Sequence, residues 1–240
     1  MTARAFILLS GGIDSSTCLF LAGREYTDVT GISVFYGQRH VRELEAAKTV
    51  CRLQKVKHHI LDLSAVVPKT MLTDTSREVP NVSYEEIEGV SPTYVPFRNG
   101  LLLSAAASWI MGEHNRSSAD FDLHVAGAEW ALYFGAHAED AHAWAYPDCT
   151  PEFIGAMANA IYMGTYQQLR LHTPLEWLTK ADIIQLGDRL GVPWDQTWSC
   201  YAGGQLHCGT CPTCRARRQG FVRAGVYDPT MYSAAPAATL

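Results

Sequence analysis

Short apolar runs alternate with segments of helical spacing along the first part of the chain. Residues 6–9 form an apolar run that ends in Ser-Gly-Gly, and apolar residues recur at helical spacing over residues 15–22. Residues 29–36 are rich in β-branched and aromatic side chains, residues 39–54 carry an apolar stripe, and residues 57–63 again have strand character. Strands that alternate with helices predict a parallel sheet joined by right-handed crossovers.

The pattern is less regular further along the chain. Residues 64–96 combine several prolines with mixed polarity, which predicts a long irregular connection of the kind that often carries function. Thr150-Pro151 and Thr179 are typical of helix starts. We expect helices over residues 99–112, 151–163 and 180–190, the first ended by Gly112 and the last followed by Gly191, and strands over residues 121–126 and 132–136.

Composition narrows the class of protein. The chain has 240 residues, of which 48% are hydrophobic and 18% charged, which predicts one large domain or one domain with an appendage. The net charge of -5 argues against a surface that wraps nucleic acid. The apolar run at residues 6–9 is too short for a signal peptide or a membrane span, so we expect a cytoplasmic protein whose seven cysteines are reduced thiols or metal ligands.

The segment between the first expected strand and helix is suited to binding phosphate. Gly11 and Gly12 let the backbone approach an anion, and the free N–H groups of the following helix point at it. Asp14 is acidic, so its expected task is to hold Mg²⁺ or to orient the loop. The alternative is an ordinary glycine turn, since the segment has neither a Walker motif nor a Gly-x-Gly-x-x-Gly motif.

The stretch from Ser10 to Ser15 resembles the Ser-Gly-Gly-x-Asp-Ser signature of the PP-loop ATP pyrophosphatases. That resemblance implies an α/β fold with a doubly wound parallel sheet, Rossmann-like and of the adenine nucleotide α-hydrolase type, in which the loop holds the pyrophosphate of ATP. The residues expected to bind ATP are Leu9, Ser10, Gly11, Gly12, Ile13, Asp14, Ser15, Ser16, Thr17, Cys18 and Leu19.

Four of the cysteines, Cys200, Cys208, Cys211 and Cys214, lie close together in the sequence. Two-residue gaps let neighbouring thiolates converge on one tetrahedral ion, and four sulfurs in a reducing compartment favour zinc. Buried free cysteines and an iron–sulfur cluster are the alternatives, and His207 is a less favoured competing ligand. Because the protein fills all four positions, we expect a structural site in a small C-terminal zinc-binding segment.

Further motifs occur in a fixed order along nearly the whole chain. They are Phe35-Tyr36-Gly37-Gln38-Arg39-His40, Pro96-Phe97-Arg98-Asn99, Tyr146-Pro147-Asp148-Cys149, Thr173-Pro174-Leu175 with Lys180-Ala181, and Ser199-Cys200-Tyr201 before the other three cysteines. With these motifs the chain resembles the 7-cyano-7-deazaguanine synthases, the QueC family. Two features depart from the family pattern: Phe97 stands where glycine is expected, and residues 125–144 are longer than in the commonest members.

The resemblance implies that 7-carboxy-7-deazaguanine is converted to 7-cyano-7-deazaguanine with ammonia and two ATP. Adenylation makes the acid reactive, ammonia displaces AMP to give the amide, and a second adenylation on the amide oxygen leads to the nitrile. The expected catalytic residues are Asp14, Arg98 and Lys180, with the two cations meeting the phosphates. The residues expected to bind the purine are Gln38, Arg39, His40, Arg98, Asp140, Tyr146 and Asp148, with His137 and Glu139 close to the pocket.

Simpler roles stay open for several of these residues. Arg98 and Lys180 could form surface salt bridges, although a cation in the first turn of a helix, as at Lys180, is locally unfavourable. Asp148 could cap the helix that starts at Pro151. The expected organisation is an ATP-binding α/β domain over residues 1–195, a zinc-binding segment over residues 196–225 and a tail over residues 226–240.

Three other functions remain open at this point. A PP-loop ligase could stop at the amide, and a tRNA-thiolating relative would need a reactive cysteine such as Cys149. A non-enzymatic nucleic-acid module would use Arg215, Arg217, Arg218 and Arg223, but such a run is more often a solvated helix face. We expect small-molecule substrates, free ammonia as the nitrogen source because no stretch remains for a glutaminase domain, and no nucleic-acid or membrane partner; a homodimer is implied by the resemblance alone.

Overall fold

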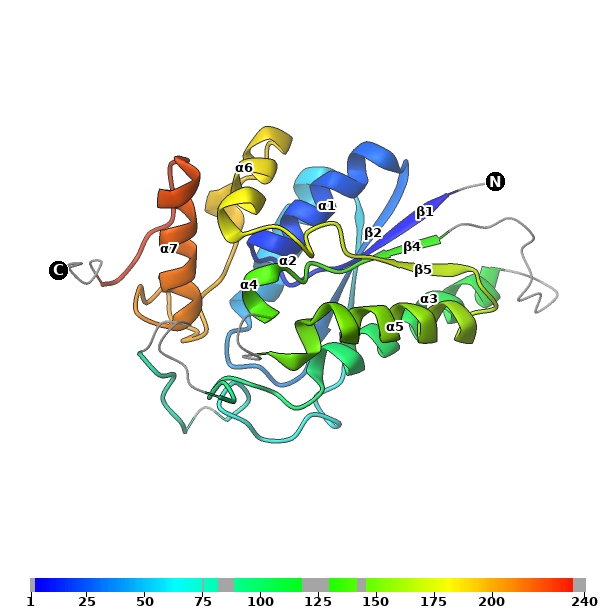
Figure 1. Ribbon diagram of the computed structural model, residues 1–240, viewed down its shortest axis with the longest axis horizontal. Coiled ribbons are helices and arrows are strands. Elements are labelled where there is room, and N and C mark those ends of the chain that lie inside the picture. Colours follow the sequence, from blue (N-terminus) through cyan, green and yellow to red (C-terminus); the bar gives the residue numbers. More distant parts are fainter. Residues whose placement is uncertain (1–2, 75, 82–88, 118–129, 142–145, 235–240) are drawn as a thin grey trace.

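One sheet of five parallel strands organises the protein (Figure 1). The computed structural model describes residues 3–74, 76–81, 89–117, 130–141 and 146–234. The strand order is β3-β2-β1-β4-β5. The strands are β1 (Arg4–Leu8), β2 (Asp28–Phe35), β3 (Lys57–Asp62), β4 (Trp130–Tyr133) and β5 (Leu169–His172). The expected parallel α/β fold is therefore confirmed.

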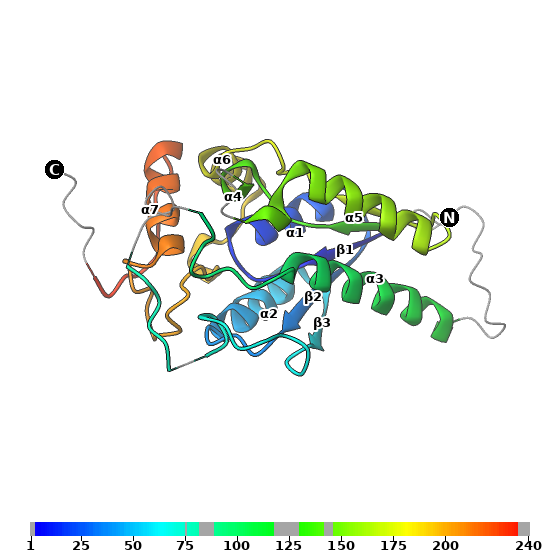
Figure 2. The ribbon, with the colours of Figure 1, turned by 60° about the horizontal axis from the view of Figure 1, so that its bottom comes forward.

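Helices cover both faces of the sheet, with α1 and α6 on one side and α3 and α5 on the other (Figure 1). The helix α7 stands at the end of the molecule opposite the start of β1 in both views (Figure 2). The helices are α1 (Ile13–Glu25), α2 (Arg42–Gln54), α3 (Arg98–Ser117), α4 (Ala138–Ala141), α5 (Pro151–Gly164), α6 (Lys180–Leu190) and α7 (Pro212–Ala224), with short 3₁₀ turns at Pro147–Cys149 and Trp194–Gln196.

The central strand β1 supplies both halves of the core. Ala5 and Ile7 pack with α1, α2 and α6, whereas Phe6 and Leu8 pack with α3 and α5. Successive side chains of a strand point to opposite faces, so a strand covered on both faces must be apolar throughout. This burial explains why β1 is a continuous apolar run in the sequence.

Most of the expected elements are present, and the two helix starts predicted at Thr150 and Thr179 are confirmed. Thr150 accepts a hydrogen bond from Phe153 N, and Thr179 forms a capping box with Asp182. The expectation that Gly112 ends its helix is wrong, because α3 continues to Ser117. One glycine costs about 1 kcal/mol in a helix, which is too little to stop a helix that packs on a sheet. Residues 121–126 lie outside the described residues, and β5 was not expected.

The strand order places a topological switch point between β1 and β4, the position at which such sheets bind ligands. The loop after β1 and the segment after β4 meet there. A Cβ at Gly135 would lie 3.2 Å from Asp14 Cβ and from Ser15 N. Gly135 therefore lets the two segments touch through their backbones.

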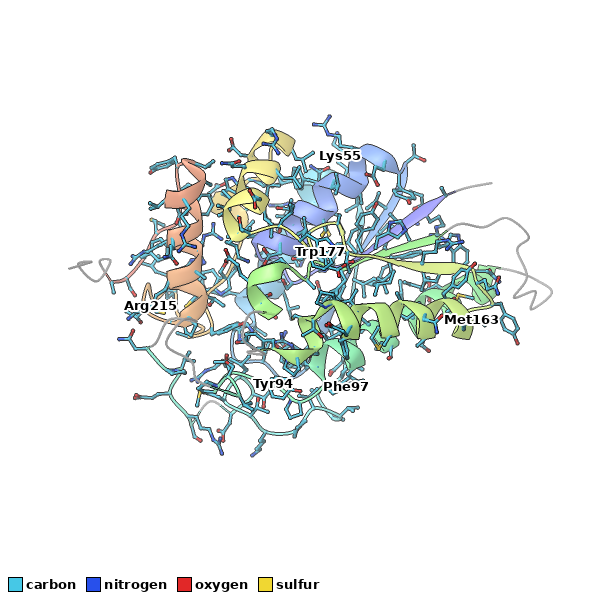
Figure 3. All side chains as sticks on the ribbon, viewed as in Figure 1. Lys55, Tyr94, Phe97, Met163, Trp177 and Arg215 are labelled. Atoms are coloured by element: carbon cyan, nitrogen blue, oxygen red, sulfur yellow. The ribbon has the colours of Figure 1, made fainter. Side chains whose placement is uncertain are left out.

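Phe97, which precedes α3, stands where the family pattern has glycine. Its backbone conformation is one that suits glycine. Its φ of 53° is left-handed, and its half-exposed ring meets Phe153 edge-on at 5.8 Å (labelled in Figure 3). A Cβ at Gly100 would lie 2.4 Å from Phe97 Cζ. The ring therefore uses the space that Gly100 leaves open, so the two positions are sterically coupled.

We predict that Gly100→Ala lowers the free energy of unfolding by about 1–3 kcal/mol, because the new methyl group collides with the Phe97 ring. The same change should be tolerated in a Phe97→Gly background. Gly112→Ala is the matched control, because nothing lies within 4 Å of a Cβ at this position. It should raise the free energy of unfolding by about 0.5–1 kcal/mol. Urea denaturation measures all four variants. An equal cost of Gly100→Ala in both backgrounds would contradict the coupling.

Candidate functional site

The loop between β1 and α1 is held open by its glycines and serines. Gly11 has a φ of 79°, and a Cβ on it would lie 2.5 Å from backbone atoms of α2. Ser10 Oγ lies 3.0 Å from Ser15 Oγ and accepts from Gly12 N at 3.3 Å. In the described chain, no side chain caps the start of α1. Its first N–H groups are therefore suited to an anion.

Lys180 extends from the first turn of α6 to this loop. Its Nζ lies 2.7 Å from Asp14 Oδ1 and 2.8 Å from His137 Nε2, and His137 Nε2 lies 3.2 Å from Asp140 Oδ2. Burial alone would lower the pKa of Lys180, but Asp14 and Asp140 outweigh it and the pKa lies above its ordinary value. Burial opposes the charge of Asp14, yet Lys180 and His137 hold the pKa of that carboxyl below its ordinary value. Lys180 is thus a fixed cation rather than half of a surface salt bridge.

Arg98 supplies a second cation at the start of α3. Its guanidinium carbon lies 5.9 Å from the centre of the Tyr36 ring. Burial works against its charge, but Tyr36, Tyr201 and Asp148 raise its pKa well above the ordinary value. Asp148 Oδ2 also accepts from Asn99 N at 2.9 Å. The carboxylate therefore caps α3, whereas the sequence suggested a cap on the helix at Pro151.

A cavity of about 230 Å³ joins these groups. It is lined by the loop after β1, the start of α2, the start of α3, the segment after β4, the first turn of α6, residues 198–201 and one face of α7. All three expected catalytic residues reach it. The expected residues on its wall are Leu9, Ser10, Gly12, Ile13, Asp14, Ser15, His40, Arg98, Asp140 and Lys180.

Other expected residues do not line the cavity. Gln38 bonds to Val34 O and to Glu43, and Arg39 donates to Arg77 O. The Tyr146 hydroxyl lies 2.6 Å from Thr93 Oγ1. Within the described chain, the expected residues that do not line the cavity are Gly11, Ser16, Thr17, Cys18, Leu19, Gln38, Arg39, Tyr146 and Asp148, and those from Ser16 to Leu19 are buried in α1. Glu139, on α4, contributes to the charge around Lys180. Of the long region, residues 125–129 and 142–144 lie outside the described residues.

Among the wall residues that sequence reasoning missed, four carry polar or charged groups of interest: Tyr36, Glu43, Tyr201 and Arg217. Arg217 is buried, and its guanidinium donates to Thr197 Oγ1 and to Trp194 O, both at 2.8 Å. The expectation of a solvated helix face is wrong at this position. The signal was its spacing, since residues three apart share a helix face and Cys214 faces inward.

The four cysteines converge beside the cavity. The sulfurs of Cys200, Cys208, Cys211 and Cys214 all lie within 4.8 Å of one another. Backbone N–H groups point at two of them: Cys208 N lies 3.3 Å from Cys200 Sγ, and Cys211 N lies 3.3 Å from Cys208 Sγ. Four thiols in one shell, with donors that stabilise thiolates, fit a tetrahedral metal such as zinc. The competing candidate His207 instead accepts from Ser199 N through Nε2.

Cys149 lies on the cavity wall but is poorly suited to attack. Burial, Asp140 and Asp148 raise its pKa well above that of an ordinary thiol. Because the thiolate is the nucleophile, a thiol held protonated is unreactive. This environment counts against the thiolating alternative.

A Ser-Gly-Gly-x-Asp-Ser loop at the switch point of a parallel sheet is typical of a PP-loop protein, and four cysteines that could hold a metal lie beside it. The family model described as "Queuosine biosynthesis protein QueC" matches residues 4–225, and the chain belongs to this family of enzymes. A protein from Thermoplasma acidophilum named 7-cyano-7-deazaguanine synthase is 41% identical over 97% of this chain and 93% of its own length. A protein of the same name from Ralstonia nicotianae is 41% identical over 97% of this chain and 100% of its own length.

Solved structures are less similar. The U34-tRNA thiolase NcsA from Methanococcus maripaludis aligns with 100% of this chain and 78% of its own, at 13% identity and a TM-score of 0.45. Among the described residues, no helix is long and apolar enough to cross a membrane.

We predict that Cys214→Ser removes about one zinc per chain and lowers the thermal midpoint, because three ligands hold the ion less tightly. Cys51→Ser, which alters a buried thiol in the main core, should retain the metal and is the control. Elemental analysis of purified protein gives the stoichiometry. Zinc retained by Cys214→Ser, or iron with sulfide in the unaltered protein, would contradict the assignment.

Proposed function

We propose that this chain converts 7-carboxy-7-deazaguanine and ammonia to 7-cyano-7-deazaguanine, using two ATP; each adenylation releases pyrophosphate, and AMP leaves in the step that follows. The observation that carries the proposal is the meeting of the glycine loop, Lys180 and Arg98 on one cavity. The names of the relatives support the same reaction. The proposal includes a cytoplasmic homodimer that acts on small molecules and not on nucleic acid.

In this proposal the loop from Ser10 to Ser15 receives the pyrophosphate part of ATP, through its N–H groups and hydroxyls. Lys180 and Arg98 neutralise the charge that develops on the α-phosphate when a carboxyl or amide oxygen attacks it. The carboxylates of Asp14 and Asp140 on the wall suit the Mg²⁺ that accompanies ATP, which would neutralise phosphate charge. Residues 1–195 would form the ATP-binding domain, residues 196–225 the zinc-binding segment and residues 226–240 a tail.

The residues proposed for the purine site fall into two groups, those on the cavity wall and those that support it. His40, Arg98 and Asp140 reach the cavity and are proposed to contact the substrate. The buried side chains of Gln38, Tyr146 and Asp148 are proposed to support the wall, and Arg39 to hold the segment after β2 through Arg77 O. Asp148 does so by capping α3 and thereby positioning Arg98.

We predict that the zinc-loaded protein, given 7-carboxy-7-deazaguanine, ATP, Mg²⁺ and ammonium, forms the nitrile with about two AMP per product, as two adenylations require. Mass spectrometry of the purine and a parallel count of AMP measure this result. Lys180→Met should slow AMP release about 100-fold to 1,000-fold, the cost of one lost electrostatic contact to a transition state. Lys55→Met, at the exposed C-terminal end of α2, is the matched control (Figure 3).

Three results would overturn the proposal. Amide as the final product, with one AMP, would favour the ligase that stops at the amide. Sulfur transfer to tRNA would favour the thiolase. Activity with glutamine but not with ammonium would refute ammonia as the nitrogen source.

A further inference from the structure

The proposed reaction must remove protons from nitrogen, and this inference rests on that proposed function. When ammonia attacks the acyl-adenylate, the C–N bond forms, the C–O bond to AMP breaks with its electron pair, and the nitrogen loses a proton. When the adenylated amide collapses, the C–O bond to AMP breaks and the last N–H proton leaves as the nitrile forms. Lys180 and Arg98 are cations, and Asp14 is paired with Lys180, so none of these three is a good acceptor.

His40 is the one histidine on the cavity wall among the described residues. Its side chain is only 2% exposed. The ring lies between Tyr36 and Tyr201, with centroid distances of 6.5 Å and 5.2 Å. Imidazole is the side chain that accepts protons near neutral pH, so His40 is a candidate proton acceptor at this cavity.

Glu43 determines which nitrogen of His40 is free. Glu43 Oε2 lies 3.2 Å from His40 Nε2, and a carboxylate at that distance places the ring proton on Nε2. Nδ1 then carries the lone pair, and it has no hydrogen-bond partner within the described part of the chain. A buried acceptor without a partner costs free energy, so such an atom is suited to a partner that arrives with the substrate.

Gln38 fixes this pair in position. Gln38 Nε2 donates to Glu43 Oε1 at 2.8 Å, and Gln38 Oε1 accepts from Tyr36 N at 2.7 Å. Glu43 is therefore oriented from one side by Gln38 and contacts His40 with its other oxygen. This arrangement gives Gln38 a role although its side chain does not reach the cavity.

The other groups that face His40 do not compete for the proton. Burial raises the pKa of both Tyr36 and Tyr201, so both rings stay neutral. Arg98 lies on Tyr36, with its guanidinium 5.9 Å from the ring centre. Glu43 is thus the anion paired with His40, in the geometry by which a carboxylate orients a histidine base.

We propose that His40, oriented by Glu43, is the general base that accepts the nitrogen proton in both the amide-forming and the nitrile-forming steps. The proton goes to Nδ1, and AMP leaves with the electron pair of the broken C–O bond. His40 is the catalytic residue of this pair, and Glu43 is a positioning residue.

The test compares two nucleophiles on His40→Gln and Glu43→Gln. Hydroxylamine is largely unprotonated at neutral pH and captures acyl-adenylates with less help from a base than ammonia needs. His40→Gln should slow nitrile formation about 100-fold when variants are compared at the same concentration of free ammonia. Hydroxamate formation should stay close to the unaltered rate, which also shows that the variant folds and adenylates. Glu43→Gln should give a smaller loss with ammonium.

His59→Gln is the matched control. His59 lies on strand β3, and its ring centroid lies 4.6 Å from that of Trp109. Equal losses with both nucleophiles in His40→Gln would mean that His40 only positions the substrate. That result would overturn the assignment of His40 as the general base. An unaltered rate of nitrile formation at the same free-ammonia concentration would overturn it as well. If the unaltered protein releases no AMP with either nucleophile, the proposed function fails, and the inference fails with it.

Discussion

The contact between Lys180 and Asp14 connects two parts of the chain that are 166 residues apart in sequence. A cation in the first turn of a helix opposes the helix dipole, and its burial adds a further cost. The carboxylates of Asp14 and Asp140 offset both costs and keep the ammonium charged. Because Asp14 belongs to the glycine loop, the same contact fixes the loop against α6 and holds a cation at the switch point.

The four-cysteine cluster holds the other side of the cavity. Cys200 lies between Ser199 and Tyr201, and Cys214 lies one helical turn before Arg217; the three neighbours all line the cavity. A metal held by these four cysteines would therefore position cavity residues from two separate segments, and its removal would disturb both Tyr201 and Arg217.

Local signals were sufficient for much of the fold. The apolar run of β1, the caps at Thr150 and Thr179, and the cysteine spacing each depend on neighbours within a few residues. The strand β5 has only four residues, so its pairing with β4 was not visible in the sequence.

The site was predictable only where a motif and the cavity coincide. Asp14, Arg98 and Lys180 reach the cavity, but Gln38 and Asp148 from the same motifs turn to backbone and side-chain partners behind it. A motif specifies residue types, whereas the direction of a side chain depends on tertiary packing. Arg217 shows the reverse case, since a run of arginines at the surface of a helix contains one that is buried.

The most direct test of the account uses 7-carboxy-7-deazaguanine labelled with ¹⁸O in both carboxyl oxygens. If the cavity directs each oxygen to the α-phosphate of ATP, both labels must leave with AMP, one in each of two AMP molecules, and the nitrile must contain none. Label in pyrophosphate or phosphate, or unlabelled AMP, would contradict attack at the α-phosphate and with it the roles of Lys180 and Arg98.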